Sequence, residues 1–141
     1  MRYGVLFRGL NVGGRGKVKM PELEALLRAQ GYRNAKTYIQ SGNAVLEADV
    51  DEATLETQIH DAFAAQFGFE SAVCVRSLPM LEGLIDNLPF SEAQLAAARN
   101  ADPEVEHLYV YFLPDAPAPE KLDALHGLEA GDTVVAGQRE I

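Results

Sequence analysis

The first 76 residues contain six apolar segments, some of strand length and others with helical spacing, and their order along the chain leaves few possible folds. Four short runs of strand length span residues 3–7, 35–40, 44–47 and 71–75. Two longer segments repeat their apolar residues at helical spacing, one after Pro21 and one after Asp51. The order is therefore βαββαβ, the ferredoxin-like signature. We expect an α+β fold with an antiparallel sheet in the spatial order 4-1-3-2.

Local chemistry predicts where the helices begin and end. Pro21 suits a first helical position, and Gly31 suits the end of the same helix. Met20 would then be the N-cap residue, and it cannot accept a strong hydrogen bond from the first-turn N–H groups. Those donors must find water, other backbone or a ligand. Asp49 or Asp51 can cap the second helix.

The remaining residues predict a second, incomplete α+β unit. Helices are expected after Ser77 and after Ser91, where Gln94 completes a capping-box pattern. Further along we expect a strand at 108–113, a short helix ending at Gly127, a strand at 133–135 and a return strand at 138–141. We assign 1–76 to the ferredoxin-like unit and 77–141 to the smaller one, packed together as one globular domain.

Composition excludes several protein classes. With 141 residues, of which 48% are hydrophobic and 23% charged, the chain has a folded protein's composition rather than that of a fibrous or disordered one. Its single cysteine, Cys74, cannot form an internal disulfide or a cysteine-rich zinc site, so we expect a cytoplasmic location. The apolar run at the start is too short for a signal peptide, and none approaches the ~20 residues that span a bilayer. We expect no membrane partner.

The net charge of −9 conceals a strong asymmetry along the chain. Residues 1–46 carry eight Lys or Arg against two Glu, a charge of +6, whereas residues 47–141 carry four against nineteen carboxylates, a charge of −15. Such polarity concentrates positive potential at one end and disfavours duplex nucleic acid. Two interpretations stay open: an anion site in the basic segment, or cations that only solvate a surface.

In the expected topology, the first and second strands end at the same edge of the sheet. That edge carries the glycine-rich stretch 9–17, the start of the first helix and the turn at 41–43. Glycine-loop N–H groups and a helix N-terminus commonly bind anions. We predict a site for a phosphate-bearing small molecule or nucleotide, with no cofactor and no metal. The predicted ligand-binding residues are Arg8, Asn11, Gly13, Gly14, Arg15, Lys17, Lys19, Ser41 and Asn43.

Other functions receive weaker support. The loop is no Walker motif, because Asn11 is not glycine and Val18 follows Lys17. No histidine or cysteine has the partners of a nucleophile or a metal site, so whether the chain is an enzyme is left open. The alternatives are an interaction or structural module, including a homodimer, an acylphosphatase-like hydrolase using Arg8 or Arg15 with Asn43, and a single-stranded nucleic-acid binder.

Several motifs, in order along nearly the whole chain, carry a family resemblance. They are RGLNVGG at 8–14, Lys19-Met20, TYIQSGN at 37–43, Leu88-Pro89-Phe90, the run at 108–113 and GQREI at 137–141. With these motifs the chain resembles the bacterial family known as domain of unknown function 1697. The resemblance implies a cytoplasmic α+β fold with ferredoxin-like units and no assigned activity or catalytic residue. It also implies that relatives continue with a basic, Asn- and Trp-containing segment, so that this chain is expected to be shortened at its C-terminus.

Overall fold

The computed structural model describes residues 1–126 and 131–141. The chain divides into two compact units, Met1–Leu84 and Ile85–Ile141, and each is described by itself. The elements of the first unit are β1 (Arg2–Phe7), α1 (Met20–Ala29), β2 (Arg33–Tyr38), β3 (Asn43–Glu47), α2 (Glu52–Phe67), β4 (Val73–Ser77) and most of α3 (Leu78–Asp86). The four strands form one antiparallel sheet in the order β2-β3-β1-β4. The predicted α+β class and strand order are confirmed.

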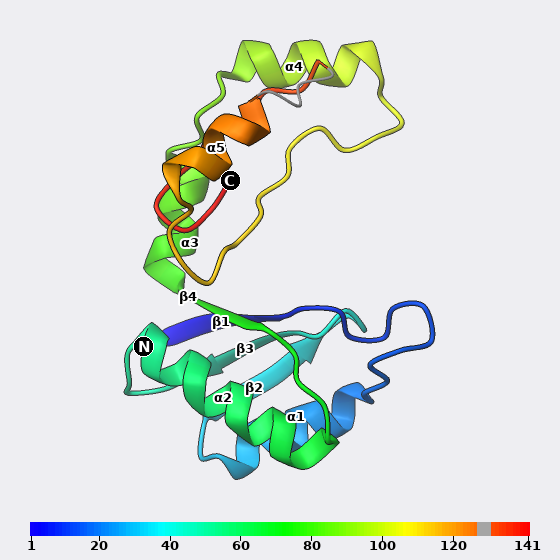
Figure 1. The fold of residues 1–141 in the computed structure, drawn as a ribbon, viewed down its shortest axis with the longest axis vertical. Coiled ribbons are helices and arrows are strands. Elements are labelled where there is room, and N and C mark those ends of the chain that lie inside the picture. The colour runs from blue at the N-terminus through cyan, green and yellow to red at the C-terminus, as the bar shows by residue number, and fades with distance from the viewer. Residues whose placement is uncertain (127–130) are drawn as a thin grey trace. The chain divides into compact units, whose positions relative to one another are not determined.

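One face of the sheet carries the core. Alternate residues of β1, namely Tyr3, Val5 and Phe7, are buried there. Helices α1 and α2 cover this face (Figure 1). At its centre the Phe63 ring contacts three other rings, with centroids 4.8–5.3 Å apart, those of Phe7, Phe67 and Phe69. Each fully buried side chain of this size contributes about 1.5–3 kcal/mol, so this layer holds the unit together.

Both outer strands of the sheet are covered by carboxylates from the helices. Glu24 of α1 accepts a hydrogen bond from the Thr37 N–H of β2 at 3.1 Å. Glu56 and Glu52 of α2 accept from the N–H groups of Val75 and Ser77 of β4 at 2.8 and 2.7 Å. These bonds satisfy donors that an edge strand otherwise presents to another chain. The sheet is therefore partly closed to edge-on association.

Some predicted boundaries differ by one or two residues, for local reasons. Strand β2 ends at Tyr38 rather than residue 40, because Ile39 turns the chain with φ of 49°. Residues 39–42 form the turn, and Asn43 already belongs to β3. The N-cap of α1 is Lys19 rather than Met20, so that prediction was wrong by one residue. As expected for this helix start, no side chain of the N-cap residue accepts a hydrogen bond from the first-turn N–H groups. Asp51 caps α2 by accepting from the Thr54 N–H at 2.9 Å.

The second unit contains less regular structure than predicted. Helix α4 (Glu92–Ala101) begins with the expected capping box of Ser91 and Gln94. Helix α5 (Pro119–His126) forms too, while its predicted end at Gly127 lies outside the described residues.

The strands predicted at 108–113, 133–135 and 138–141 do not form. The first of them is reduced to a single antiparallel bridge between Phe112 and Glu140. Within the described residues no third strand pairs with these two segments, and two isolated segments gain too little burial to extend the ladder. In agreement, the rings of Tyr109 and Tyr111 are exposed.

Candidate functional site

The loop that joins β1 to α1, residues 8–18, is called here the glycine loop. Its first residues are anchored on both sides. The Arg8 N–H donates to Ala72 O at 2.9 Å, and Ser71 Oγ donates to Arg8 O at 2.9 Å. Leu10 is buried against the hairpin turn, where a Cβ on Gly42 would lie 2.6 Å from the leucine Cδ1. Gly42, with φ of 88°, therefore lets the turn pack on the loop.

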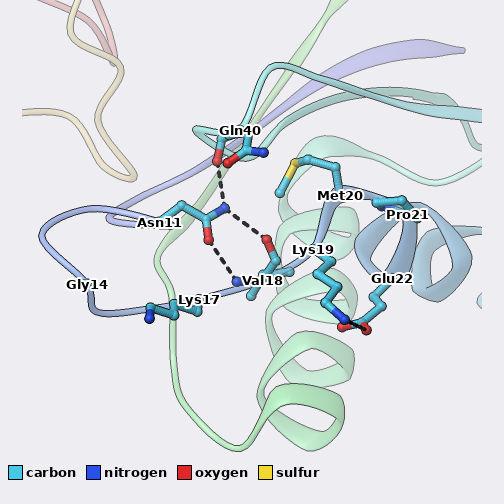
Figure 2. Close-up of a pocket in the computed structure, with 9 residues that line it drawn as sticks. All are labelled: Asn11, Gly14, Lys17, Val18, Lys19, Met20, Pro21, Glu22 and Gln40. Carbon is cyan, nitrogen blue, oxygen red and sulfur yellow. Dashed lines mark hydrogen bonds and ion pairs between the residues drawn. The ribbon is translucent and has the colours of Figure 1, made fainter.

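Asn11 holds the middle of the glycine loop in place. Its Nδ2 donates to Val18 O at 2.9 Å and to Gln40 O at 2.8 Å, and its Oδ1 accepts from the Val18 N–H at 2.9 Å (Figure 2). Its φ of 55° is tolerated by asparagine better than by most residues. The side chain predicted to orient a ligand thus uses both amide hydrogens to join the two arms of the glycine loop to each other and to the hairpin turn.

The tip of the glycine loop is a tight turn. The Arg15 N–H donates to Val12 O at 3.0 Å across Gly13 and Gly14, whose φ angles are 59° and 76°. Gly16 has φ of 60°, and a Cβ there would lie 2.8 Å from the Gly9 carbonyl oxygen. The left-handed backbone that the glycines were predicted to permit is confirmed at all three positions.

Three cations on the glycine loop are available to a ligand. Arg8, Arg15 and Lys17 are exposed, and none forms an ion pair with a described residue. By contrast, Arg28 pairs with Glu24 at 2.7 Å, and Lys19 lies 3.7 Å from Glu22. Three exposed cations that form no ion pair with a described residue therefore lie on this one loop of a chain whose net charge is −9.

An open hollow of about 850 Å³ lies between the glycine loop, the start of α1 and the hairpin turn. Its lining residues are Asn11, Gly14, Lys17, Val18, Lys19, Met20, Pro21, Glu22 and Gln40 (Figure 2). Four of the nine predicted residues are among them: Asn11, Gly14, Lys17 and Lys19. The other five, Arg8, Gly13, Arg15, Ser41 and Asn43, do not line it. Of these, Asn43 donates from Nδ2 to Ser41 Oγ at 3.2 Å.

The first turn of α1 offers an anion little. Pro21 has no N–H, and the N–H groups of Glu22 and Leu23 both donate to Lys19 O at 3.0 and 3.1 Å. The Glu22 carboxylate also occupies the turn where the positive end of the helix dipole lies. Attraction for an anion at this hollow must therefore come from Lys17 rather than from the helix.

Comparison with known proteins assigns the family. The model of the family described as "Protein of unknown function (DUF1697)" matches residues 1–141. The chain belongs to the DUF1697 family. Among solved structures it is similar to conserved bacterial protein SP0830 from Streptococcus pneumoniae, with 28% sequence identity and a TM-score of 0.58. That match covers 79% of this chain and 71% of the other. No curated protein shows a significant match.

Sequence reasoning missed five lining residues of this DUF1697 chain: Val18, Met20, Pro21, Glu22 and Gln40. Met20 and Pro21 were assigned only to the helix start, and the fold places both beside the hollow. Gln40 was expected in a strand, and its place in the turn follows from the positive φ of Ile39. A left-handed conformation at a β-branched residue carries no sequence signal, so Gln40 could not have been found.

Groups able to do acid–base or metal chemistry are dispersed in this DUF1697 structure. Among the described residues, no group of three or more His, Cys, Asp or Glu is placed to hold a metal ion. His60 Nδ1 lies 3.1 Å from Asp61 Oδ1 on the exposed surface of α2, outside the hollow. In the described part of the chain, no helix is long and apolar enough to cross a membrane.

Proposed function

We propose that this protein binds a phosphate-bearing small molecule in the hollow beside the glycine loop. The observation that carries the proposal is Lys17, which lines the hollow and makes no ion pair with a described residue. Asn11 holds the backbone next to this lysine. The following residue, Val18, accepts a hydrogen bond from Asn11 Nδ2 through its carbonyl oxygen and donates one to Asn11 Oδ1 through its N–H. A cation on a fixed backbone loses less conformational freedom when a ligand binds.

The charge pattern favours a small ligand. Lys17 lines the hollow, with Arg8 and Arg15 on the same loop, but residues 47–141 carry a charge of −15. A polyanion extending over that surface would be repelled, whereas one phosphate group would meet only the loop. The proposal covers binding of this molecule and assigns no chemical reaction to it. The single cysteine keeps the cytoplasm as its expected location.

A thermal-shift titration with inorganic phosphate and ribose 5-phosphate at low salt tests the proposal. A ligand at ten times its dissociation constant should stabilise the fold by about 1.4 kcal/mol, which raises Tm by about 4 °C in a protein of this size. Lys17→Ala should abolish the shift. Lys36→Ala is the matched control, because it removes an exposed lysine of the same basic segment that does not line the hollow. Equal shifts in both variants would refute the proposal.

An interaction module is the second candidate, and exposed apolar side chains near the same edge favour it. Val12 is 64% exposed at the tip of the glycine loop, and Tyr38 and Ile39 at the hairpin are 69% and 57% exposed. Surface apolar groups of this size often mark protein contacts. A homodimer detected by light scattering, with no response to phosphate compounds, would favour this candidate. The acylphosphatase alternative gains no support, since Asn43 does not line the hollow.

A further inference from the structure

We propose that the ligand of this hollow is a nucleotide, with its phosphate at Lys17, its base against the Met20 thioether and the edge of the base at Gln40. This inference rests on the proposed function and names the ligand class of the same site. Three properties of the hollow support it, namely its size, its apolar side and its free amide.

Size favours an occupant larger than a bare phosphate ion. At about 850 Å³ the hollow has the volume of sites that hold cofactor-sized molecules, which range over about 300–1,000 Å³. A lone phosphate at Lys17 would leave most of that volume to water. A ligand that fills the hollow needs a body several times larger than its anionic group.

Charge gives the hollow two different ends. Lys17 has no ion pair with a described residue, and in Figure 2 its side chain extends from the loop close to Gly14. At the other end Lys19 lies 3.7 Å from the Glu22 carboxylate, which neutralises it. Excess positive charge is thus confined to the Lys17 end. The ligand that matches this pattern has one anionic end and one uncharged end.

The uncharged end would meet apolar groups and an unoccupied amide. Met20 and Pro21 line the hollow, and in Figure 2 the Met20 side chain extends from the start of α1 toward Gln40 and Asn11. A thioether packs well against an aromatic ring. The Gln40 side chain is exposed and bonds to no described residue, while the backbone carbonyl oxygen of Gln40 accepts a hydrogen bond from Asn11 Nδ2 at 2.8 Å. Its amide carries the donor and the acceptor that the edge of a nucleobase requires.

Methionine-methyl NMR tests this inference directly. The chain has three methionines, Met1, Met20 and Met80, and only Met20 lines the hollow, so the other two serve as internal references. AMP and UMP should move the Met20 methyl resonance upfield through the ring current of the base. Ribose 5-phosphate should bind about tenfold more weakly and cause no upfield shift. Lys17→Ala should remove the response to all three compounds.

Two variants separate the base contact from the phosphate contact. Met20→Leu keeps the volume but removes the thioether, so it should weaken AMP binding more than it weakens ribose 5-phosphate binding. Gln40→Ala should act in the same direction. If ribose 5-phosphate binds as tightly as AMP and Met20 does not shift, the nucleotide inference fails while the proposed function stands. If no phosphate compound binds, both fail.

Discussion

The two units of the chain use their apolar side chains differently. In Met1–Leu84 the sheet and the helices α1 and α2 enclose a core in which Val5, Leu23 and Phe63 have no exposed surface. In Ile85–Ile141 no described residue is buried, and Tyr109 and Tyr111 remain more than 60% exposed. Both units have apolar periodicity. Only the first has two layers whose apolar faces meet, and this contact converts a pattern into stable structure.

Truncating one apolar side chain in each unit should give the largest difference in stability between them. Phe63→Ala removes a fully buried ring that contacts three others, so the free energy of unfolding should fall by about 3–5 kcal/mol. Leu95→Ala in α4 removes a half-buried side chain, and its cost should stay below about 1 kcal/mol. Urea unfolding followed by circular dichroism measures both. Equal costs would break the comparison.

Each unit contains a glycine in the left-handed conformation, and replacing each by alanine compares how tightly the backbone is packed in the two units. Gly42 and Gly131 have φ of 88° and 95°, but a Cβ at Gly42 would meet Leu10 at 2.6 Å, whereas one at Gly131 would meet nothing within 4 Å. Gly131→Ala should therefore cost about 1 kcal/mol of backbone strain. Gly42→Ala should cost more than about 2 kcal/mol, because the turn must also move. Thermal unfolding of the two variants tests this order.

Acid should act on the first unit through its caps and ion pairs. The hydrogen bonds from Thr54 to Asp51 lower the pKa of that carboxyl below its ordinary value, and a backbone hydrogen bond from Thr37 does the same for the pKa of Glu24. Because a depressed pKa stabilises the fold above the unfolded-state pKa, about 4, stability should be lost as the pH falls through the lower folded-state values. Measuring Tm between pH 7 and pH 2 should show this loss.

Two cap variants provide the control for the acid experiment. Asp51→Asn keeps an acceptor for the Thr54 N–H but cannot titrate, so its Tm should depend less on pH than that of the unmodified chain. Ser91→Ala removes the hydroxyl cap of α4 and should cost about 1 kcal/mol at pH 7 and at pH 4 alike. An Asp51→Asn variant with the same pH profile as the unmodified chain would contradict this assignment.

The smallest expected effect on stability is at the proposed site. Lys17 is exposed and unpaired within the described chain, so Lys17→Ala should change the free energy of unfolding by less than about 0.5 kcal/mol. Lys121→Ala in α5 should be as neutral, and it should leave phosphate binding intact. Chemical denaturation without ligand checks both. A large loss in Lys17→Ala would make this lysine structural.

The sequence predicted four of the residues that line the hollow, but it did not reveal the contacts between distant residues that shape the site. Lys17 and Lys19 were found because cations beside a glycine-rich stretch are visible in the sequence. Asn11 was also identified, but its three hydrogen bonds reach Val18 and Gln40, and the second of these lies 29 residues away. A ligand-binding amide and a structural one look alike until such distant partners are known.

Local physics determined what the sequence alone could establish. Period-2 and helical patterns, the Asp51 cap and the Ser91–Gln94 capping box involve neighbours within a few residues, so the βαββαβ order and these helix starts were readable in advance. Contacts between distant residues decided the rest. Among the described residues the apolar run at 108–113 makes a single bridge and leaves Tyr109 and Tyr111 exposed, and Asn11 joins the two arms of the glycine loop to the hairpin turn beside the hollow.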